Sequence, residues 1–133
     1  MTIKSSKTLV SEALQQIETL DSVKTKELLE QEKCTLIDIR DIREIWQEGA
    51  VDESLHIPRG MLEFWLDPSS PYYKKEKFED NKKKLILFCA GGMRSALAAK
   101  SLQDMGYKNI AHVDGGFGAM KLNGFKIAKK TKS

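Results

Sequence analysis

The sequence predicts an α/β domain in which a mainly parallel sheet is covered by helices on both faces. Two observations support this class. Short apolar stretches alternate along the chain with segments of helical periodicity, and several stretches, such as 84–88 (KLILF), are apolar on both faces. The chain has 133 residues, 41% of them hydrophobic, which suits one domain with a substantial core. We therefore expect a single domain over residues 1–133.

The individual elements follow from periodicity, capping residues and glycine or proline breaks. Apolar residues recur at helical spacing from Leu9 to Leu20, Thr25 suits a helix N-cap, and Gly49 and Gly106 suit helix ends. In chain order, the predicted helices lie at about 8–20, 26–31, 41–49, 60–66, 94–105 and 115–124. The predicted strands lie at 34–39, 54–58, 84–88 and 109–114.

The distribution of charge limits the classes of binding partner that we expect. The formal net charge is +3, and much of the positive charge lies in two segments, 72–84 and a basic tail at about 127–133. We expect a solvated loop and a frayed terminus there. The tail lacks interleaved aromatic or arginine residues, so we expect no nucleic-acid partner. Without a long apolar run or a signal-peptide pattern, we expect no membrane contact and a cytoplasmic location.

Cys89 is the strongest candidate for chemistry. It follows the apolar strand 84–88, and ligands of parallel α/β sheets gather at the carboxyl ends of strands. Gly91 and Gly92 allow a sharp turn into the next helix, whose first amides then point at the sulfur. Arg94 adds positive charge. Amides, helix dipole and arginine all favour a thiolate and an anion bound to it. The alternative is a buried cysteine that merely ends a core strand.

Several segments, taken together, resemble the rhodanese family of sulfurtransferases. The loop CAGGMRS (89–95) resembles the family's active-site loop. The segments LIDIRDIREIWQEG (36–49), LHIPRGMLEFWLDPSSPYY (55–73) and HVDGGFGAMKLNG (112–124) resemble its other motifs in the same order. The resemblance covers residues 23–126. One departure is Met120, where the family usually has tryptophan, and we expect the methionine to fill the same apolar volume.

The resemblance implies a three-layer fold with a central, mainly parallel, five-stranded sheet. It also implies a double displacement, in which Cys89 takes sulfur from a donor such as thiosulfate and passes it from a persulfide to cyanide or a cellular thiol. Arg94 joins Cys89 as a catalytic residue. The substrate-binding residues are Ala90, Gly91, Gly92, Met93, Ser95 and Arg59. No metal or organic cofactor is called for, and a sulfur-acceptor protein is a further partner to consider.

Loop length separates this reaction from phosphoryl chemistry. Four residues lie between Cys89 and Arg94, whereas tyrosine phosphatases need five for their amides to ring a phosphate. Sulfur transfer is therefore favoured over a phosphatase or arsenate reductase. A non-catalytic rhodanese module or persulfide carrier that docks a partner is the other alternative. The sequence leaves the physiological donor and acceptor and the oligomeric state open.

Supporting roles are assigned to charged residues near the strand ends. Asp38 and Arg40 end the first predicted strand, so they either shape the catalytic loop or form a structural salt bridge. Arg59 is expected to guide an anion at the pocket mouth, with a solvated arginine as the alternative.

The two histidines and the second cysteine receive structural assignments. His56 and His112 lack ligand spacing and are expected to be packed or hydrogen-bonded. Cys34 is expected to be core filler rather than a resolving thiol.

Overall fold

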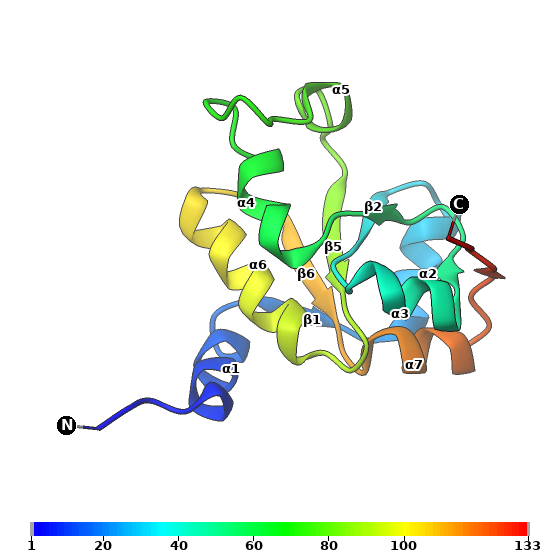
Figure 1. Cartoon of the computed structure of the whole chain (residues 1–133), viewed down its shortest axis with the longest axis horizontal. Coiled ribbons are helices and arrows are strands. Elements are labelled where there is room, and N and C mark those ends of the chain that lie inside the picture. Colours follow the sequence, from blue (N-terminus) through cyan, green and yellow to red (C-terminus); the bar gives the residue numbers. More distant parts are fainter. Residues whose placement is uncertain (1, 133) are drawn as a thin grey trace.

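The computed structural model describes residues 2–132 and forms three layers, with a sheet between two groups of helices (Figure 1). The main sheet contains β1 (Glu18–Leu20), β2 (Cys34–Asp38), β4 (Leu55–His56), β5 (Lys84–Phe88) and β6 (Ile110–Val113). A separate two-stranded sheet pairs β3 (Ala50–Val51) with β7 (Ile127–Ala128). The helices are α1 (Ser6–Leu14), α2 (Ser22–Glu30), α3 (Ile42–Glu48), η1 (Arg59–Met61), α4 (Leu62–Trp65), α5 (Lys75–Phe78), α6 (Met93–Met105) and α7 (Gly116–Leu122).

The five main strands are all parallel and lie in the order β1-β6-β5-β2-β4. This confirms the predicted α/β class with a five-stranded sheet. In Figure 1, α1, α4 and α6 lie on one side of β5, and α2, α3 and α7 lie on the other. The central strand therefore ends between the two groups of helices, at the carboxyl edge of the sheet, where ligands of such sheets bind.

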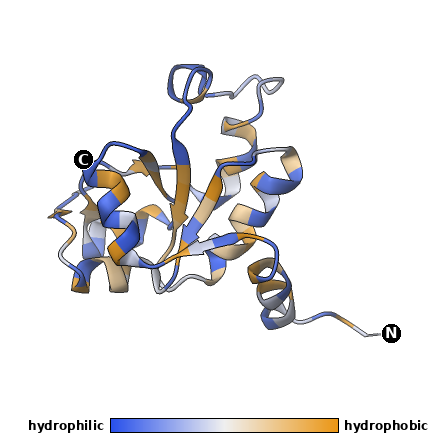
Figure 2. Ribbon diagram, turned by 180° about the vertical axis from the view of Figure 1, so that it is seen from behind, coloured by the Kyte–Doolittle hydropathy of each residue, from blue (hydrophilic) through white to orange (hydrophobic). Residues whose placement is uncertain are grey.

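Alternate residues of β5 serve two separate cores. Leu85 and Leu87 pack with residues of α1, α4 and α6, whereas Ile86 and Phe88 pack with α7 and its neighbours. Figure 2 shows the hydrophobic colour along the central strand and the hydrophilic colour around α5. Met120 is fully buried in the α7-side core, which is consistent with the expected filling of apolar volume.

The predicted N-terminal helix over 8–20 is wrong in its second half. The helix α1 begins after the N-cap Ser5 and ends at Leu14, and Glu18–Leu20 forms the edge strand β1 beside β6. The apolar residues Ile17 and Leu20 continued the helical spacing. However, pairing with β6 supplies backbone hydrogen bonds that local spacing does not reveal, and it overrides the weak helical preference.

The other predicted elements differ less from the observed ones. The helix α2 is capped by Asp21, whose carboxylate accepts from the Lys24 N–H at 2.7 Å, so Thr25 lies inside the helix rather than at its N-cap. The strand Lys84–Phe88 is confirmed, and α6 begins one residue before the predicted start at 94. The segment expected to be a loop contains α5, and β7 occupies the start of the basic tail.

Met1 and Ser133, the two ends of the predicted domain, lie outside the described residues. Within residues 2–132, none of the helices combines the length and apolar character needed to span a bilayer.

Candidate active site

Cys89 lies directly after β5 and is 1% exposed. Its carbonyl oxygen accepts a hydrogen bond of 2.8 Å from the Phe117 N–H at the start of α7, and α6 begins four residues after it. Two helix N-termini thus meet the cysteine at the carboxyl end of the central strand. This is the position that the sequence predicted for it.

Three groups surround the Cys89 sulfur. The N–H of Gly92 lies 3.1 Å from Sγ, the N–H of Ser95 lies at 3.4 Å, and the Ser95 hydroxyl lies at 3.6 Å. Burial raises the pKa of the Cys89 thiol, but hydrogen bonds from Ser95, Gly92 and Gly91 outweigh burial and leave the pKa below its ordinary value. The geometry favours a thiolate at a site that is nearly closed to solvent.

Gly92 and Gly116 make the backbone path of this loop possible. Gly92 caps α6 with a φ of 113°, a left-handed conformation that side chains disfavour. Gly91 does not have a positive φ, so the turn requires only one of the two predicted glycines. Gly116 approaches the loop from α7, and a Cβ there would overlap the Cys89 carbonyl oxygen and lie 2.8 Å from the Ala90 carbonyl carbon. The close contact holds the loop backbone against α7.

Arg94 connects the loop to α3. Its guanidinium donates two hydrogen bonds to the Glu44 carboxylate, at 2.8 and 3.0 Å. The bond from Arg94 is the main reason that the pKa of Glu44 is lowered. Glu44 also completes a capping box with Asp41. Glu44 was not among the predicted site residues, although its acidic position in the first turn of a helix was visible.

These features agree with comparisons to known proteins. A model of the rhodanese-like domain matches residues 22–123, most of the chain. This protein belongs to the rhodanese family. The boundaries lie close to the segment 23–126 over which the motifs resemble the family.

Two curated relatives of this rhodanese domain carry different names. The chain is 34% identical over 86 residues to "Putative thiosulfate sulfurtransferase, mitochondrial" of Schizosaccharomyces pombe, which covers 60% of the chain and 58% of the relative. It is 31% identical over 100 residues to a tRNA uridine(34) hydroxylase of Prochlorococcus marinus strain MIT 9312, covering 73% of the chain and 31% of the relative. The chain therefore spans only part of these relatives.

Two solved structures are similar over nearly the whole domain. A protein of unknown function from Rhodopseudomonas palustris CGA009, described as a possible tyrosine phosphatase, is 46% identical with a TM-score of 0.89. The match covers 96% of this chain and 98% of the other. The polysulfide-sulfur transferase homodimer of Wolinella succinogenes is 30% identical with a TM-score of 0.71, covering 92% and 85%.

The outer residues of the rhodanese loop contribute backbone rather than enclosed side chains. Gly91 is exposed, and Met93 is 68% exposed, whereas Ser95 is fully buried beside the sulfur. Ala90 is half-buried, and its carbonyl oxygen accepts from the Gly118 N–H at 3.4 Å. The predicted loop residues therefore lie together, with Ser95 inside and Met93 on the rim.

Asp38 and Arg40 form a buried ion pair with each other. Arg40 Nη2 lies 2.9 Å from the Asp38 carboxylate and 2.8 Å from the Gly49 carbonyl oxygen, and both side chains are essentially unexposed. The guanidinium carbon of Arg40 stacks 4.0 Å from the centroid of the Phe117 ring. The pair touches the cysteine loop through Phe117, whose N–H donates to the Cys89 carbonyl oxygen.

Arg59 is held by a carboxylate. Its guanidinium donates to Glu63 at 2.8 and 2.9 Å, and Glu63 also accepts from the Ser101 hydroxyl at 2.6 Å. The Glu63 partner offsets the charge that was expected to guide an anion.

Both histidines are hydrogen-bonded, as predicted. His56 Nε2 lies 2.8 Å from the Arg40 carbonyl oxygen, and His112 lies between Ser95 and Thr19. Sequence reasoning did not connect His112 to the site, because Ser95, His112 and Thr19 are distant in the chain and meet only through the strand order.

Cys34 lies at the opposite end of the sheet. It pairs in register with Lys84 at the start of β5, five residues before Cys89, a separation of roughly 16 Å along the strand. A disulfide between the two would need Cα atoms within about 7 Å. Burial raises the pKa of Cys34 to about 11, despite the opposing charge of Lys83. Both features favour the structural assignment.

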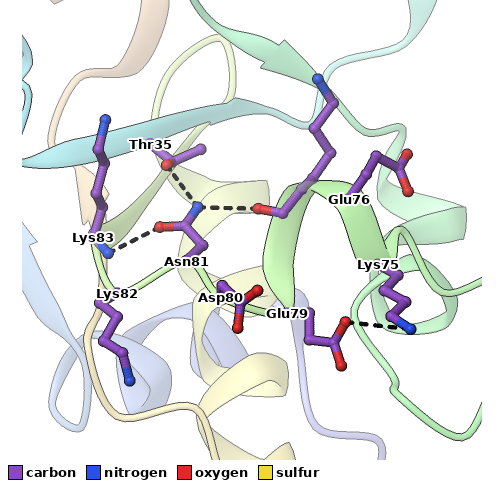
Figure 3. Close-up of a pocket in the computed structure, with 9 residues that line it drawn as sticks. Thr35, Lys75, Glu76, Glu79, Asp80, Asn81, Lys82 and Lys83 are labelled. Atoms are coloured by element: carbon purple, nitrogen blue, oxygen red, sulfur yellow. Dashed lines mark hydrogen bonds and ion pairs between the residues drawn. The ribbon is translucent and has the colours of Figure 1, made fainter.

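A hollow of about 700 Å³ also lies away from the cysteine loop (Figure 3). Its walls come from Thr35 near the start of β2, the α5 segment and Lys83 just before β5. Figure 3 shows Asn81 at its centre, bonded to Thr35, to Lys83 and to a backbone carbonyl oxygen of the α5 turn. This hollow is at the amino-terminal edge of the sheet and does not contribute to the cysteine site. Among residues 2–132, the histidine, cysteine and carboxylate side chains form no cluster of three suited to a metal ion.

Proposed function

We propose that this rhodanese domain is a sulfurtransferase that carries sulfur on Cys89. The observation that carries the proposal is the sulfur cradle, in which the N–H groups of Gly92 and Ser95 lie 3.1 and 3.4 Å from Sγ. The relative named as a thiosulfate sulfurtransferase and the polysulfide-sulfur transferase structure support the same class of reaction. A cytoplasmic location remains part of the proposal.

The first half-reaction loads the cysteine. The Cys89 thiolate attacks the outer sulfur of a donor such as thiosulfate, an S–S bond forms to Cys89, and the S–S bond of the donor breaks with release of sulfite. The product is a Cys89 persulfide whose terminal sulfur carries the negative charge. Backbone N–H groups at the start of α6 are preorganised donors for this charge.

The second half-reaction unloads it. A thiophilic acceptor, cyanide or a cellular thiolate, attacks the terminal sulfur, the persulfide S–S bond breaks, and the Cys89 thiolate returns. Arg94 keeps the loop attached to α3 through Glu44, so the cradle keeps its shape between the two steps. No external reductant is consumed by the exchange.

Mass spectrometry of the intact protein tests the proposal. Wild-type protein treated with thiosulfate and freed of excess donor should gain the mass of one sulfur atom, and cyanide should remove it. C89S should gain nothing, whereas C34S should load like wild type because Cys34 lies at the far end of the sheet. Loading of C89S, or failure of wild type with thiosulfate, polysulfide and glutathione persulfide alike, would overturn the proposal.

A phosphatase is the second candidate, favoured by the solved structure described as a possible tyrosine phosphatase. The four residues between Cys89 and Arg94 argue against it, because this ring of amides is one residue shorter than phosphatases use. Turnover of an aryl phosphate that is lost in C89S would support this reading. The hydroxylase of Prochlorococcus marinus strain MIT 9312 is about three times as long as the matched segment, so the similarity covers only a part of that enzyme.

A further inference from the structure

A chain of polar side chains runs from the buried cysteine to the surface. The Ser95 hydroxyl, 3.6 Å from Cys89 Sγ, lies 2.9 Å from His112 Nδ1, and His112 Nε2 lies 3.0 Å from the Thr19 hydroxyl. Ser95 and His112 are at most 1% exposed, whereas Thr19 is exposed on the edge strand. Strand pairing fixes the outer contact, because Thr19 is directly opposite His112 in the β1–β6 register.

The single hydroxyl proton of Ser95 has three acceptors within reach. These are Cys89 Sγ, the Gly92 carbonyl oxygen at 3.3 Å and His112 Nδ1. If Nδ1 is unprotonated, it is the nearest acceptor and draws the proton away from the sulfur. If Nδ1 carries a proton, it donates to Ser95 instead. The hydroxyl then has the Gly92 carbonyl oxygen and the thiolate as acceptors, and the full negative charge makes the thiolate the stronger one.

We propose that His112 is a positioning residue that directs the Ser95 hydroxyl at the Cys89 sulfur. In this arrangement Thr19 donates to Nε2, Nδ1–H donates to Ser95, and Ser95 donates to the thiolate. Every hydrogen bond of the chain runs toward the negative sulfur, so each strengthens the next. The inference rests on the proposed function in one respect: it assumes that the Cys89 thiolate is the useful form.

The surroundings keep the imidazole neutral, as this arrangement needs. Burial lowers the pKa of His112, although the charge of Asp114 opposes burial, so the ring is neutral near pH 7 and one nitrogen can accept from Thr19. The charged group that interacts electrostatically with the Cys89 sulfur is Arg94. Asp38 and Glu44 interact in turn with the Arg94 guanidinium. None of these competes for the Ser95 proton.

Nitrogen NMR of the wild-type protein tests the tautomer directly. The chain has two histidines, so a sample with nitrogen-labelled histidine shows the signals of two imidazole rings. The signals that remain in H56Q belong to His112. We expect His112 to be the neutral Nδ1–H tautomer near pH 7. A neutral Nε2–H ring would overturn the proposal, because Nδ1 would then accept from Ser95. This measurement needs no variant at the buried site.

A pair of variants tests the effect on the sulfur. Titration of thiolate absorbance, with C89S as the blank, gives the pKa of Cys89. H112L removes the group that orients the Ser95 hydroxyl, which can then turn to the Gly92 carbonyl oxygen at 3.3 Å. The midpoint should therefore rise by up to about one pH unit, the scale of one hydrogen bond to a charged group. H112N keeps an N–H donor near the place of Nδ1 and should remain closer to wild type. Equal midpoints in wild type and a folded H112L would refute the positioning role.

The two proposals can fail separately. The titration and the NMR use no sulfur donor, so they report on His112 even if thiosulfate does not load Cys89. If the midpoint moves as expected and no donor loads wild type, the sulfurtransferase proposal alone fails. If wild type loads and H112L keeps the wild-type midpoint, the positioning proposal alone fails.

Discussion

Replacing Gly116 by alanine should distort the loop that carries Cys89 through a backbone contact. The new Cβ would overlap the Cys89 carbonyl oxygen and lie 2.8 Å from the Ala90 carbonyl carbon, and both neighbours are backbone atoms with little freedom to move. The φ of 54° adds a left-handed cost of about 1–2 kcal/mol for a side chain. Overpacking adds about 1–3 kcal/mol. We therefore expect G116A to lose about 2–5 kcal/mol of unfolding free energy.

Gly118 provides the matched control, because it lies in the same helix and a Cβ there meets nothing within 4 Å. G118A should be neutral or gain up to about 1 kcal/mol through helix propensity. Urea denaturation gives the free energies, and sulfur loading of Cys89 gives the effect on the site. If G116A is as stable as G118A and loads at the same rate, the contact between α7 and the loop does not support the cysteine, and the reasoning fails.

Three further outcomes follow from the site and its surroundings. Because hydrogen bonds from Ser95 and the loop amides outweigh burial and lower the pKa of Cys89, its alkylation by iodoacetamide should persist below the ordinary thiol pKa and fall only as pH drops through the lowered value. A pH profile with an ordinary thiol midpoint would contradict this. Cys34, whose pKa burial raises to about 11, should stay unlabelled in the native protein at pH 7, and peptide mapping checks the site. R40M should cost about 3–5 kcal/mol in urea denaturation because it leaves the Asp38 carboxylate buried without its cationic partner, and D38L in the same chain should recover part of this loss. A loss below about 1 kcal/mol would show that the carboxylate escapes to water.

The fold was predictable wherever one local pattern decided the element. Lys84–Phe88 is apolar and short, and Gly106 closes the helix Met93–Met105, so strand and helix boundaries agree with the sequence to within a residue or so. The edge strand Glu18–Leu20 was not predictable in this way. Its apolar residues fit a helix equally well, and only the backbone groups of β6 beside it decide in favour of a strand.

The sequence by itself determined the candidate nucleophile and the length of the loop around it: Cys89 follows a buried strand, and four residues separate it from Arg94. Only the tertiary structure decided what surrounds the sulfur. Glu44, His112 and Gly116 come from three separate segments, and the order β1-β6-β5-β2-β4 brings their elements around the end of β5. Local patterns specify which residues face the core and which cap a helix. Contacts across a parallel sheet depend on which strands become neighbours. That order is decided by the whole fold, because both faces of the sheet must be buried against helices at the same time.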